Sequence, residues 1–356
     1  MSAARTRAPW SGAALGLVAA ALFGASTPLA KLLLGAIDPW LLAGLLYLGS
    51  GLGLGVLYAV RRASQAVRSE ASLRRADLPW LIAVIATGGV LAPVLLMVGL
   101  SHTEASAAAL LLNLEGLATM ALAWLVFREN VDRRILLGAG AILAGAVLLT
   151  WQDGAPIGWG ALAIVGACIA WGVDNNLTRR LSSADPVQIA MVKGAVAGVA
   201  NCALAATAGA HLPAAPSVLW AGLVGFLGYG VSLVLFVRAL RSVGTARTSA
   251  YFTTAPFLGA VLSIVLLGEP LTLQLVIAGA LMAVGLYLHL AERHQHEHVH
   301  SELFHEHPHL HDDHHQHSHA PSDPPGQPHV HGHRHIALAH SHAHFPDLHH
   351  RHDHPA

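Results

Sequence analysis

The stretch LPWLIAVIATGGVLAPVLLMVGL, residues 78–100, runs for 23 positions without a charged side chain. A helix of roughly 20 apolar residues crosses the hydrocarbon core of a bilayer, which is about 30 Å thick. The stretch therefore predicts a transmembrane helix. Residues 218–240, VLWAGLVGFLGYGVSLVLFVRAL, have a similar apolar pattern, and Trp220 lies 140 positions after Trp80. The two stretches together indicate a membrane protein whose sequence repeats itself.

The composition of the whole chain agrees with a membrane protein. Hydrophobic residues make up 54% and charged residues only 11%, whereas soluble domains carry about 25% charged residues. The net charge is zero with neutral histidine, so nothing indicates a nucleic-acid partner. Cys168 and Cys202 both fall in apolar segments and are expected to be packed thiols.

Ten apolar segments are long enough to span the bilayer. The predicted spans are residues 11–34, 40–60, 78–100, 105–127, 135–151, 157–177, 187–208, 218–240, 245–267 and 273–290. If the N-terminus is cytoplasmic, arginine occurs at every cytoplasmic loop or its flank, and the loops on the other side contain no Lys or Arg. Because positive charge marks cytoplasmic loops, we expect a multi-pass protein of the cytoplasmic membrane with both termini in the cytoplasm.

The repeat extends along the whole predicted membrane region. With the same shift of 140, Leu100 matches Leu240 and Glu129 matches Glu269; near the start of each half, Gly24 matches Gly172 with a shift of 148. Five spans per copy is an odd number, so the second copy must enter the membrane upside down. The predicted fold class is an all-α integral membrane protein, with ten transmembrane helices arranged as two inverted five-helix repeats. The predicted divisions are a cytoplasmic N-terminus (1–10), the repeats (11–151 and 157–290) and a disordered histidine-rich cytoplasmic tail (291–356).

Several short motifs make this pattern more specific. They are Phe23-Gly24-Ala25-Ser26-Thr27-Pro28, Trp171-Gly172, Ala239-Leu240, Ala255-Pro256 and Gly268-Glu269-Pro270, and the matching Gly99-Leu100, Glu115-Gly116 and Arg128-Glu129-Asn130. With them, residues 11–290 resemble a pair of EamA-type domains of the drug/metabolite transporter superfamily. The resemblance implies alternating access around a central cavity and export of metabolites, amino acids or drug-like solutes. The resemblance leads us to expect an apolar cavity, and the chain departs from this expectation at Glu115-Gly116. The corresponding position of the second repeat is Pro256.

Glu115 is the most informative residue in the predicted spans, because it lies halfway along the fourth one. A carboxylate at that depth must face a cavity, find a cation or be protonated. Two readings remain open: a neutral carboxyl held by a neighbouring helix, or a substrate or proton site. Thr119 shares the helix face of Glu115, whereas Asn113 does not.

A second polar group lies near the predicted cytoplasmic end of the sixth and seventh spans. Asp174 and Asn175 are close to the end of one, and Lys193 is about two turns into the other. Asp174 and Lys193 lie at similar depth, so they are expected to form an ion pair. A solute contact and snorkelling of Lys193 are the alternatives.

The remaining candidates for lining the translocation path are Thr27, Pro28, Tyr251 and Pro256. A proline within a span frees a backbone carbonyl and bends the helix, so Pro28 and Pro256 are candidate gate positions in opposite repeats. Lys31 is interpreted as a snorkelling or gate residue. Glu129 and Glu269 are interpreted as duplicated cap or loop contacts.

Residues 294–354 contain 23 of the 26 histidines. Imidazole is a ligand for nickel, cobalt, zinc and copper, so the tail is expected to bind nickel, cobalt or zinc. Incidental metal affinity and proton buffering are the alternatives. The predicted ligands are His294, His296, His298, His300, His305, His307, His309, His311, His314, His315, His317 and His319.

The sequence as a whole favours a secondary transporter, since no G-x-x-x-x-G-K-[ST] motif for ATP is present. No other cofactor is required, and the expected partners are the lipid bilayer, a small-molecule substrate and transition-metal ions; a homodimer is left open. A divalent-metal exporter is the alternative within this class. A metal-sensing or metal-binding membrane protein without transport is the alternative of another class. An enzyme is not expected, because His102, His211 and His289 are far apart and no nucleophile or base clusters with them.

Overall fold

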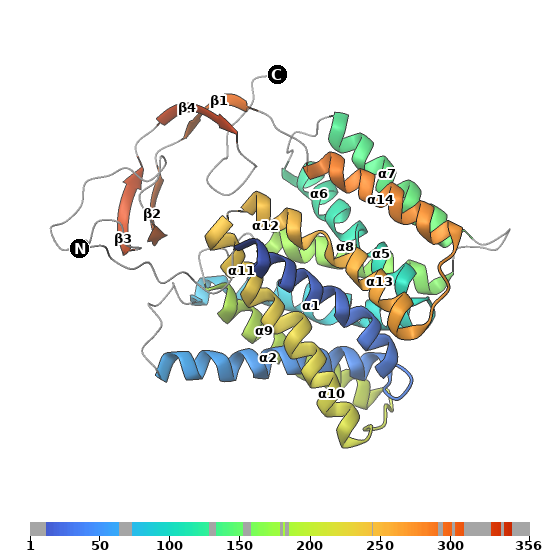
Figure 1. Ribbon diagram of the computed structural model, residues 1–356. Coiled ribbons are helices and arrows are strands. Elements are labelled where there is room, and N and C mark those ends of the chain that lie inside the picture. Colours follow the sequence, from blue (N-terminus) through green and yellow to red (C-terminus); the bar gives the residue numbers. More distant parts are fainter. Residues whose placement is uncertain are drawn as a thin grey trace, which may run out of the picture.

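The computed structural model describes residues 12–63, 73–127, 133–151, 158–178, 181, 185–243 and 245–290, and four segments of the tail. Up to residue 290, the regular structure of the described residues is helical. Ten helices are long and apolar enough to cross a membrane (Figure 1). The prediction of an all-α membrane fold is confirmed, and no end of these ten helices differs from the predicted span by more than three residues.

Each repeat supplies five spans, of which the third and fourth are interrupted. In the first repeat, the first, second and fifth spans are α1 (Gly12–Leu33), α2 (Pro39–Ala63) and α7 (Arg133–Thr150). The third span consists of η1 (Arg75–Asp77), α3 (Leu78–Val84), η2 (Ile85–Leu91) and α4 (Ala92–Ser101). The fourth span consists of α5 (Ala105–Leu111) and α6 (Leu114–Phe127). In the second repeat, the first, second and fifth spans are α8 (Trp159–Thr178), α9 (Pro186–Thr207) and α14 (Leu273–Leu290). The third span consists of α10 (Ala215–Gly225), η4 (Phe226–Val231) and α11 (Ser232–Val243). The fourth span consists of α12 (Thr245–Phe252) and α13 (Ala255–Leu267).

The interruptions occupy matching positions in the two repeats. The segments η2 and η4 are single stretches of π-helix in the third span of each copy, and such stretches often occur at functional sites. The fourth span breaks between α5 and α6 and again between α12 and α13. Pro93 and Pro256 lie in the first turn of the helix that follows an interruption. Proline has no backbone N–H, and in the first turn of a helix this group would have no partner within the helix. The prolines therefore mark where a span resumes.

The two repeats contact each other through equivalent helices. The second helices, α2 and α9, pack together, and so do the fifth helices, α7 and α14 (Figure 1). α1 packs against α11 and α13 of the second repeat, and α8 packs reciprocally against α4 and α6 of the first. Glycines allow close approach, as membrane helices require: a Cβ on Gly194 would lie 2.8 Å from the backbone nitrogen of Gly51. This reciprocal packing is what two inverted copies are expected to make.

The buried apolar side chains are unequally distributed between the two ends of the bundle. The large cluster includes Ile37, Leu100, Ala105 and Ala205, which lie at the ends predicted to be extracellular. A small cluster of Leu81, Val84, Leu181 and Ile189 lies at the opposite, predicted cytoplasmic end. The apolar packing is therefore more extensive at the predicted outer end.

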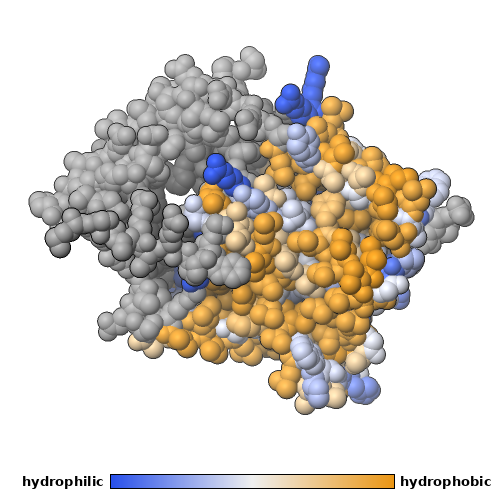
Figure 2. All heavy atoms as spheres, in the orientation of Figure 1, coloured by the Kyte–Doolittle hydropathy of each residue, from blue (hydrophilic) through white to orange (hydrophobic). Residues whose placement is uncertain are grey.

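Large apolar side chains also cover the outside of the bundle. Leu52, Val56, Leu137 and Val265 are each more than 60% exposed, and the face in Figure 2 is mostly hydrophobic. A soluble protein would not present so wide an apolar surface. This surface is suited to lipid.

Four segments of the tail are described, and the predicted disorder of the tail as a whole stays a prediction. The four segments are strands that pair antiparallel, β1 with β4 and β2 with β3, in a register that sets His298 opposite His340 and His307 opposite His331. Histidine alternates with other residues here, and a period of two is the period of a strand. The strands are β1 (Gln295–His300), β2 (Leu303–His309), β3 (His329–His335) and β4 (Leu338–Ala343).

Candidate functional site

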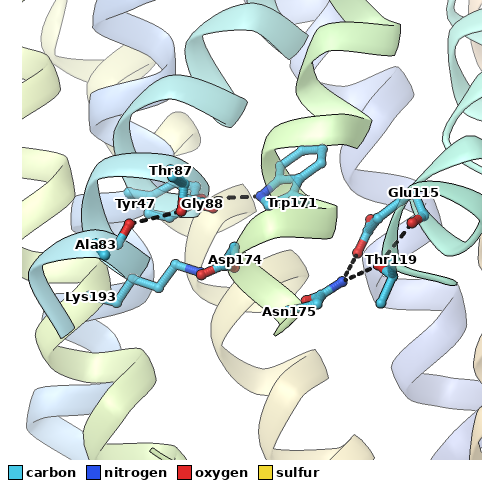
Figure 3. A network of polar contacts seen from close by, with 10 residues as sticks. All are labelled: Tyr47, Ala83, Thr87, Gly88, Glu115, Thr119, Trp171, Asp174, Asn175 and Lys193. Atoms are coloured by element: carbon cyan, nitrogen blue, oxygen red, sulfur yellow. Dashed lines mark hydrogen bonds and ion pairs between the residues drawn. The ribbon is translucent and has the colours of Figure 1, made fainter. Parts of the chain in front are cut away.

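The predicted ion pair is present between α8 and α9. Lys193 Nζ donates to Asp174 Oδ2 at 2.5 Å, and only 17% of the lysine and 6% of the aspartate side chain are exposed (Figure 3). Pairing lowers the cost of two charges within the membrane. Asp174 also lies directly against Gly88 of η2, because a Cβ there would overlap the carboxylate. Gly88 is thus required for the close packing of the carboxylate.

The carbonyl groups of η2 are the acceptors that join the third span to three others. Tyr47 donates to the Gly88 carbonyl at 2.7 Å, and Trp171 Nε1 donates to the same oxygen at 3.1 Å (Figure 3). Asn201 Nδ2 donates to the Gly89 carbonyl at 3.1 Å. The second, sixth and seventh spans therefore meet at this interrupted segment.

A second polar contact joins α6 to α8. Asn175 Nδ2 donates to Glu115 Oε1 at 3.0 Å and lies 3.1 Å from Thr119 Oγ1, which donates to the Glu115 carbonyl at 2.9 Å (Figure 3). Asn176 donates to the Thr119 carbonyl at 3.0 Å and to Gly172 at 2.8 Å. Asn175 is exposed and Glu115 is half-buried. The carboxyl of Glu115 is therefore held by a neutral amide that belongs to an exposed residue.

The predicted helix face of Glu115 is confirmed. Thr119 shares the contact with Asn175, whereas Asn113 donates to the Leu110 carbonyl at 2.8 Å and does not join it. Asp174 and Asn175 are consecutive residues of α8, so the ion pair and the contact to Glu115 lie side by side (Figure 3). The two polar contacts thus form one site, which we call the polar cluster: Glu115, Thr119, Asp174, Asn175 and Lys193.

Aromatic rings extend from the polar cluster toward the second repeat. Tyr47 bonds the Gly88 carbonyl, beside which the Asp174 carboxylate packs, and its ring centroid is 5.7 Å from that of Tyr229 in η4. Tyr229 meets Phe23 at 5.9 Å, edge to face, and Phe23 meets Phe252 at 5.3 Å. These rings come from spans of both repeats.

Among the described residues, no hydrogen bond or ion pair is seen between the other predicted lining residues and the polar cluster. Thr27 and Pro28 are buried in α1. Tyr251 is half-buried and packs beside Gly16, where a Cβ would lie 3.1 Å from its ring. Pro256 is half-buried in the first turn of α13. Their role in translocation stays a prediction.

At the opposite end of the bundle, Lys31 binds the carboxyl end of α4. Its Nζ donates to the Leu100 carbonyl at 2.5 Å and to the Thr103 carbonyl at 2.8 Å. A cation at a helix C-terminus satisfies carbonyls that have no helical partner. Lys31 therefore makes specific contacts to a helix end, in addition to any snorkelling.

Glu269 binds the turn between α4 and α5 from the other repeat. Its two oxygens accept from the backbone N–H of Ala105 at 2.7 Å and of Ser106 at 2.8 Å, which caps the start of α5. The predicted cap role is confirmed for Glu269, and its counterpart Glu129 lies outside the described residues. We call the contacts of Lys31 and Glu269 to this turn the clasp.

No metal site is apparent in the part of the chain whose side chains the structure describes. Those residues contain no group of three or more His, Cys, Asp or Glu able to hold an ion. His289 Nε2 instead lies 2.9 Å from the Ile135 carbonyl. The side chains of the predicted tail ligands lie outside the description, so metal binding there stays a prediction.

Sequence reasoning did not identify Tyr47, Gly88 and Asn201 as parts of the site. Each is a single residue in an apolar span, without a partner at helical spacing. The Gly88-Gly89 pair and the only asparagine of the seventh span were the available signals. Neither one predicts which neighbouring helix it would meet.

Comparison with known proteins places this geometry among transporters. The EamA-like transporter family matches residues 10–151 and 158–291. An uncharacterized transporter of Methanothermobacter thermautotrophicus is 29% identical over 290 residues, which cover 76% of this chain and 84% of the relative. The uncharacterized transporter YyaM of Bacillus subtilis is 24% identical over 275 residues, covering 74% and 88%. One solved crystal structure shares the fold with a TM-score of 0.57 at 21% identity, covering 78% of this chain and 96% of that one.

Proposed function

Because this chain belongs to the EamA-like transporter family, we propose that it moves a small solute across the cytoplasmic membrane by alternating access, with the polar cluster as its solute contact. The solute is a metabolite, an amino acid or a drug-like molecule. Export is the direction implied by the resemblance to EamA-type transporters. The arginine distribution supports a cytoplasmic position for both termini.

The contact between Glu115 and Asn175 is the observation that carries this proposal. Glu115 lies midway along a span, yet the residue is only half-buried and its partner Asn175 is exposed. A structural carboxyl in a membrane helix is expected to be enclosed by its partners, because an ionisable group exposed to lipid is costly. A carboxyl at this depth whose hydrogen-bond partner is exposed is better suited to receive a solute.

The unequal ends of the bundle support alternating access. At the predicted outer end, the large apolar cluster and the clasp bring both repeats together. At the other end, the polar cluster retains solvent-accessible groups. Reciprocal packing of equivalent helices offers a second arrangement in which the two ends exchange roles. The structure is then the conformer closed at the outer end.

The test uses a matched pair of carboxylate substitutions. Untargeted metabolite profiling of cells with and without the protein identifies the solute, and its flux is then measured in proteoliposomes. Glu115→Gln is expected to reduce flux at least about tenfold, because a carboxylate contact to a charged solute contributes more than 1 kcal/mol. Glu104→Gln, the same change at an exposed turn, should leave flux unaltered. Unchanged flux in Glu115→Gln would falsify the assignment.

A second proposal concerns the tail, because 23 histidines lie between residues 294 and 354. We propose that the tail binds nickel, cobalt or zinc and modulates the transporter without forming its pathway. Transport of these ions themselves is the alternative function. The scarcity of clustered ligands among the described side chains favours the modulating role.

A further inference from the structure

Few acidic or basic side chains lie deep in the described spans. Among the described residues that lie beyond the terminal four of each span, the only Asp, Glu, Lys, Arg or His residues are Glu115, Asp174 and Lys193. Lys193 is paired with Asp174 at 2.5 Å, whereas Glu115 has the neutral Asn175 as its side-chain partner. With all three groups ionised, the cluster carries one unmatched negative charge.

The carboxylate of Asp174 adds a second acceptor to this cluster. Its Oδ1 is buried and has no hydrogen-bond partner, although 94% of the side chain is removed from solvent. Thr178 interacts with the same carboxylate without a hydrogen bond to Oδ1. An unpaired buried acceptor is costly, so a ligand whose donor reaches Oδ1 when the surrounding helices move apart would be stabilised.

We propose that the polar cluster selects a monocation, an amine carried as its ammonium ion, over anions and zwitterions. This inference rests on the proposed function and names the charge of its solute. An ammonium group supplies both the positive charge that Glu115 lacks and donors for the free acceptors. A carboxylate on the solute would need a cation of its own. Lys193 is already bonded to Asp174, and Lys31 is bonded to two carbonyls in the clasp.

The neighbouring rings extend this selection to the body of the solute. Tyr229, Phe23 and Phe252 are half-buried, and Tyr47 joins them to Gly88, against which the Asp174 carboxylate packs. Aromatic faces attract cations and accept apolar groups. The expected solute is therefore an amine with an aromatic or apolar body.

The experiment compares four ligands that share one body and differ in charge: benzylamine, benzyl alcohol, benzoate and phenylglycine. Dissociation constants come from the ligand-dependent thermal stabilisation of the purified full-length protein at neutral pH. Benzylamine is expected to bind at least about tenfold more tightly than the other three, since tenfold corresponds to one charge-assisted contact. The preference should disappear in Glu115→Gln and persist in Glu115→Asp, which keeps the charge, and in the control Glu104→Gln.

Equal binding of benzoate or phenylglycine, failure of benzylamine to bind selectively, or an unchanged preference in Glu115→Gln would each overturn the inference. Transport is measured separately, by flux of the profiled solute in proteoliposomes. Flux of an anion through the wild-type protein would refute the charge selection while the proposed function stands. Selective binding of benzylamine without any solute flux would support the charge selection and refute transport.

Discussion

The Asp174–Lys193 pair is an electrostatic contact within the span interior that joins two helices of the second repeat. Removing one partner leaves the other as an uncompensated buried charge, which costs about 3–5 kcal/mol in buried pairs. We expect Asp174→Asn and Lys193→Met each to lower the free energy of unfolding by a few kcal/mol. The double variant should lose much less than the sum of the two, because no lone charge remains.

The free energies are measured by detergent-induced unfolding of the purified protein, followed by circular dichroism. The control combines Asp174→Asn with Lys31→Met at the opposite end of the bundle, where the two losses should add. Additive losses for Asp174 and Lys193 themselves would contradict a coupled pair.

At the scale of single residues, the sequence predicted contacts that follow from charge and helix geometry, but not those that depend on how distant helices pack. Asp174 and Lys193 could be paired in advance because each charge needs compensation and both lie at similar depth. Thr119 could be placed beside Glu115 because the helix repeat fixes its face. The bonds from Tyr47 and Asn201 to the η2 carbonyls depend on helix packing between distant segments, which one sequence does not encode in its local pattern.

At the scale of elements, the clasp connects α1 and the end of α13 to the turn between α4 and α5. Glu269 makes two charge-assisted hydrogen bonds there, each worth about 1.5–3 kcal/mol. Glu269→Ala should therefore favour opening of the outer end. A cysteine placed at Ala108, which is fully buried in α5, should then react with an impermeant thiol reagent about tenfold faster or more.

The labelling is measured in intact cells, in a background with Cys168→Ala and Cys202→Ala. Glu104→Ala is the matched control, because Glu104 precedes α5 but its side chain makes no capping hydrogen bond. The same labelling rate in Glu269→Ala and the unaltered clasp, or an equal increase in Glu104→Ala, would contradict the role of the clasp in closing the outer end.

The spans themselves could be predicted from the sequence, whereas their interruptions could not. Membrane thickness sets the length of each apolar segment, so the ends agree within three residues. The π-helices η2 and η4 leave hydropathy unchanged, and the carbonyls of η2 accept hydrogen bonds from side chains of other spans. Gly88 recurs as Gly228, 140 positions later, but a repeated glycine does not by itself predict a π-helix.

At the scale of the whole molecule, the proposed orientation can be tested independently of the solute. Single cysteines at Asp153 and Pro213, in the background with Cys168→Ala and Cys202→Ala, should be labelled by an impermeant reagent in intact cells. One at Ser69 should be labelled only after the membrane is opened, because the arginines on its side of the predicted membrane indicate the cytoplasm. The reverse pattern would invert the assignment of the clasp and the polar cluster to the two sides.

The tail is the part of the molecule whose role depends least on the helical bundle. The described helices close their packing by residue 290, so a chain that ends after Arg293 should still insert and fold. Full-length protein is expected to bind several nickel or zinc ions that the truncated protein does not, as measured by calorimetric titration of both. Because coordination needs neutral imidazole, affinity should fall as the pH drops through about 6.5, the ordinary pKa of histidine.

A comparison of cells that carry the full-length or the truncated protein then distinguishes a regulatory tail from one with incidental metal affinity. If the tail modulates the transporter, growth in added nickel or zinc and flux of the solute should differ between full-length and truncated protein, with equal amounts of each in the membrane. Weak or pH-independent binding would contradict the histidine ligands. Strong binding with identical growth and flux would keep the ligands and remove their link to transport, since a tail that regulates the bundle must change what the bundle does when the metal is bound.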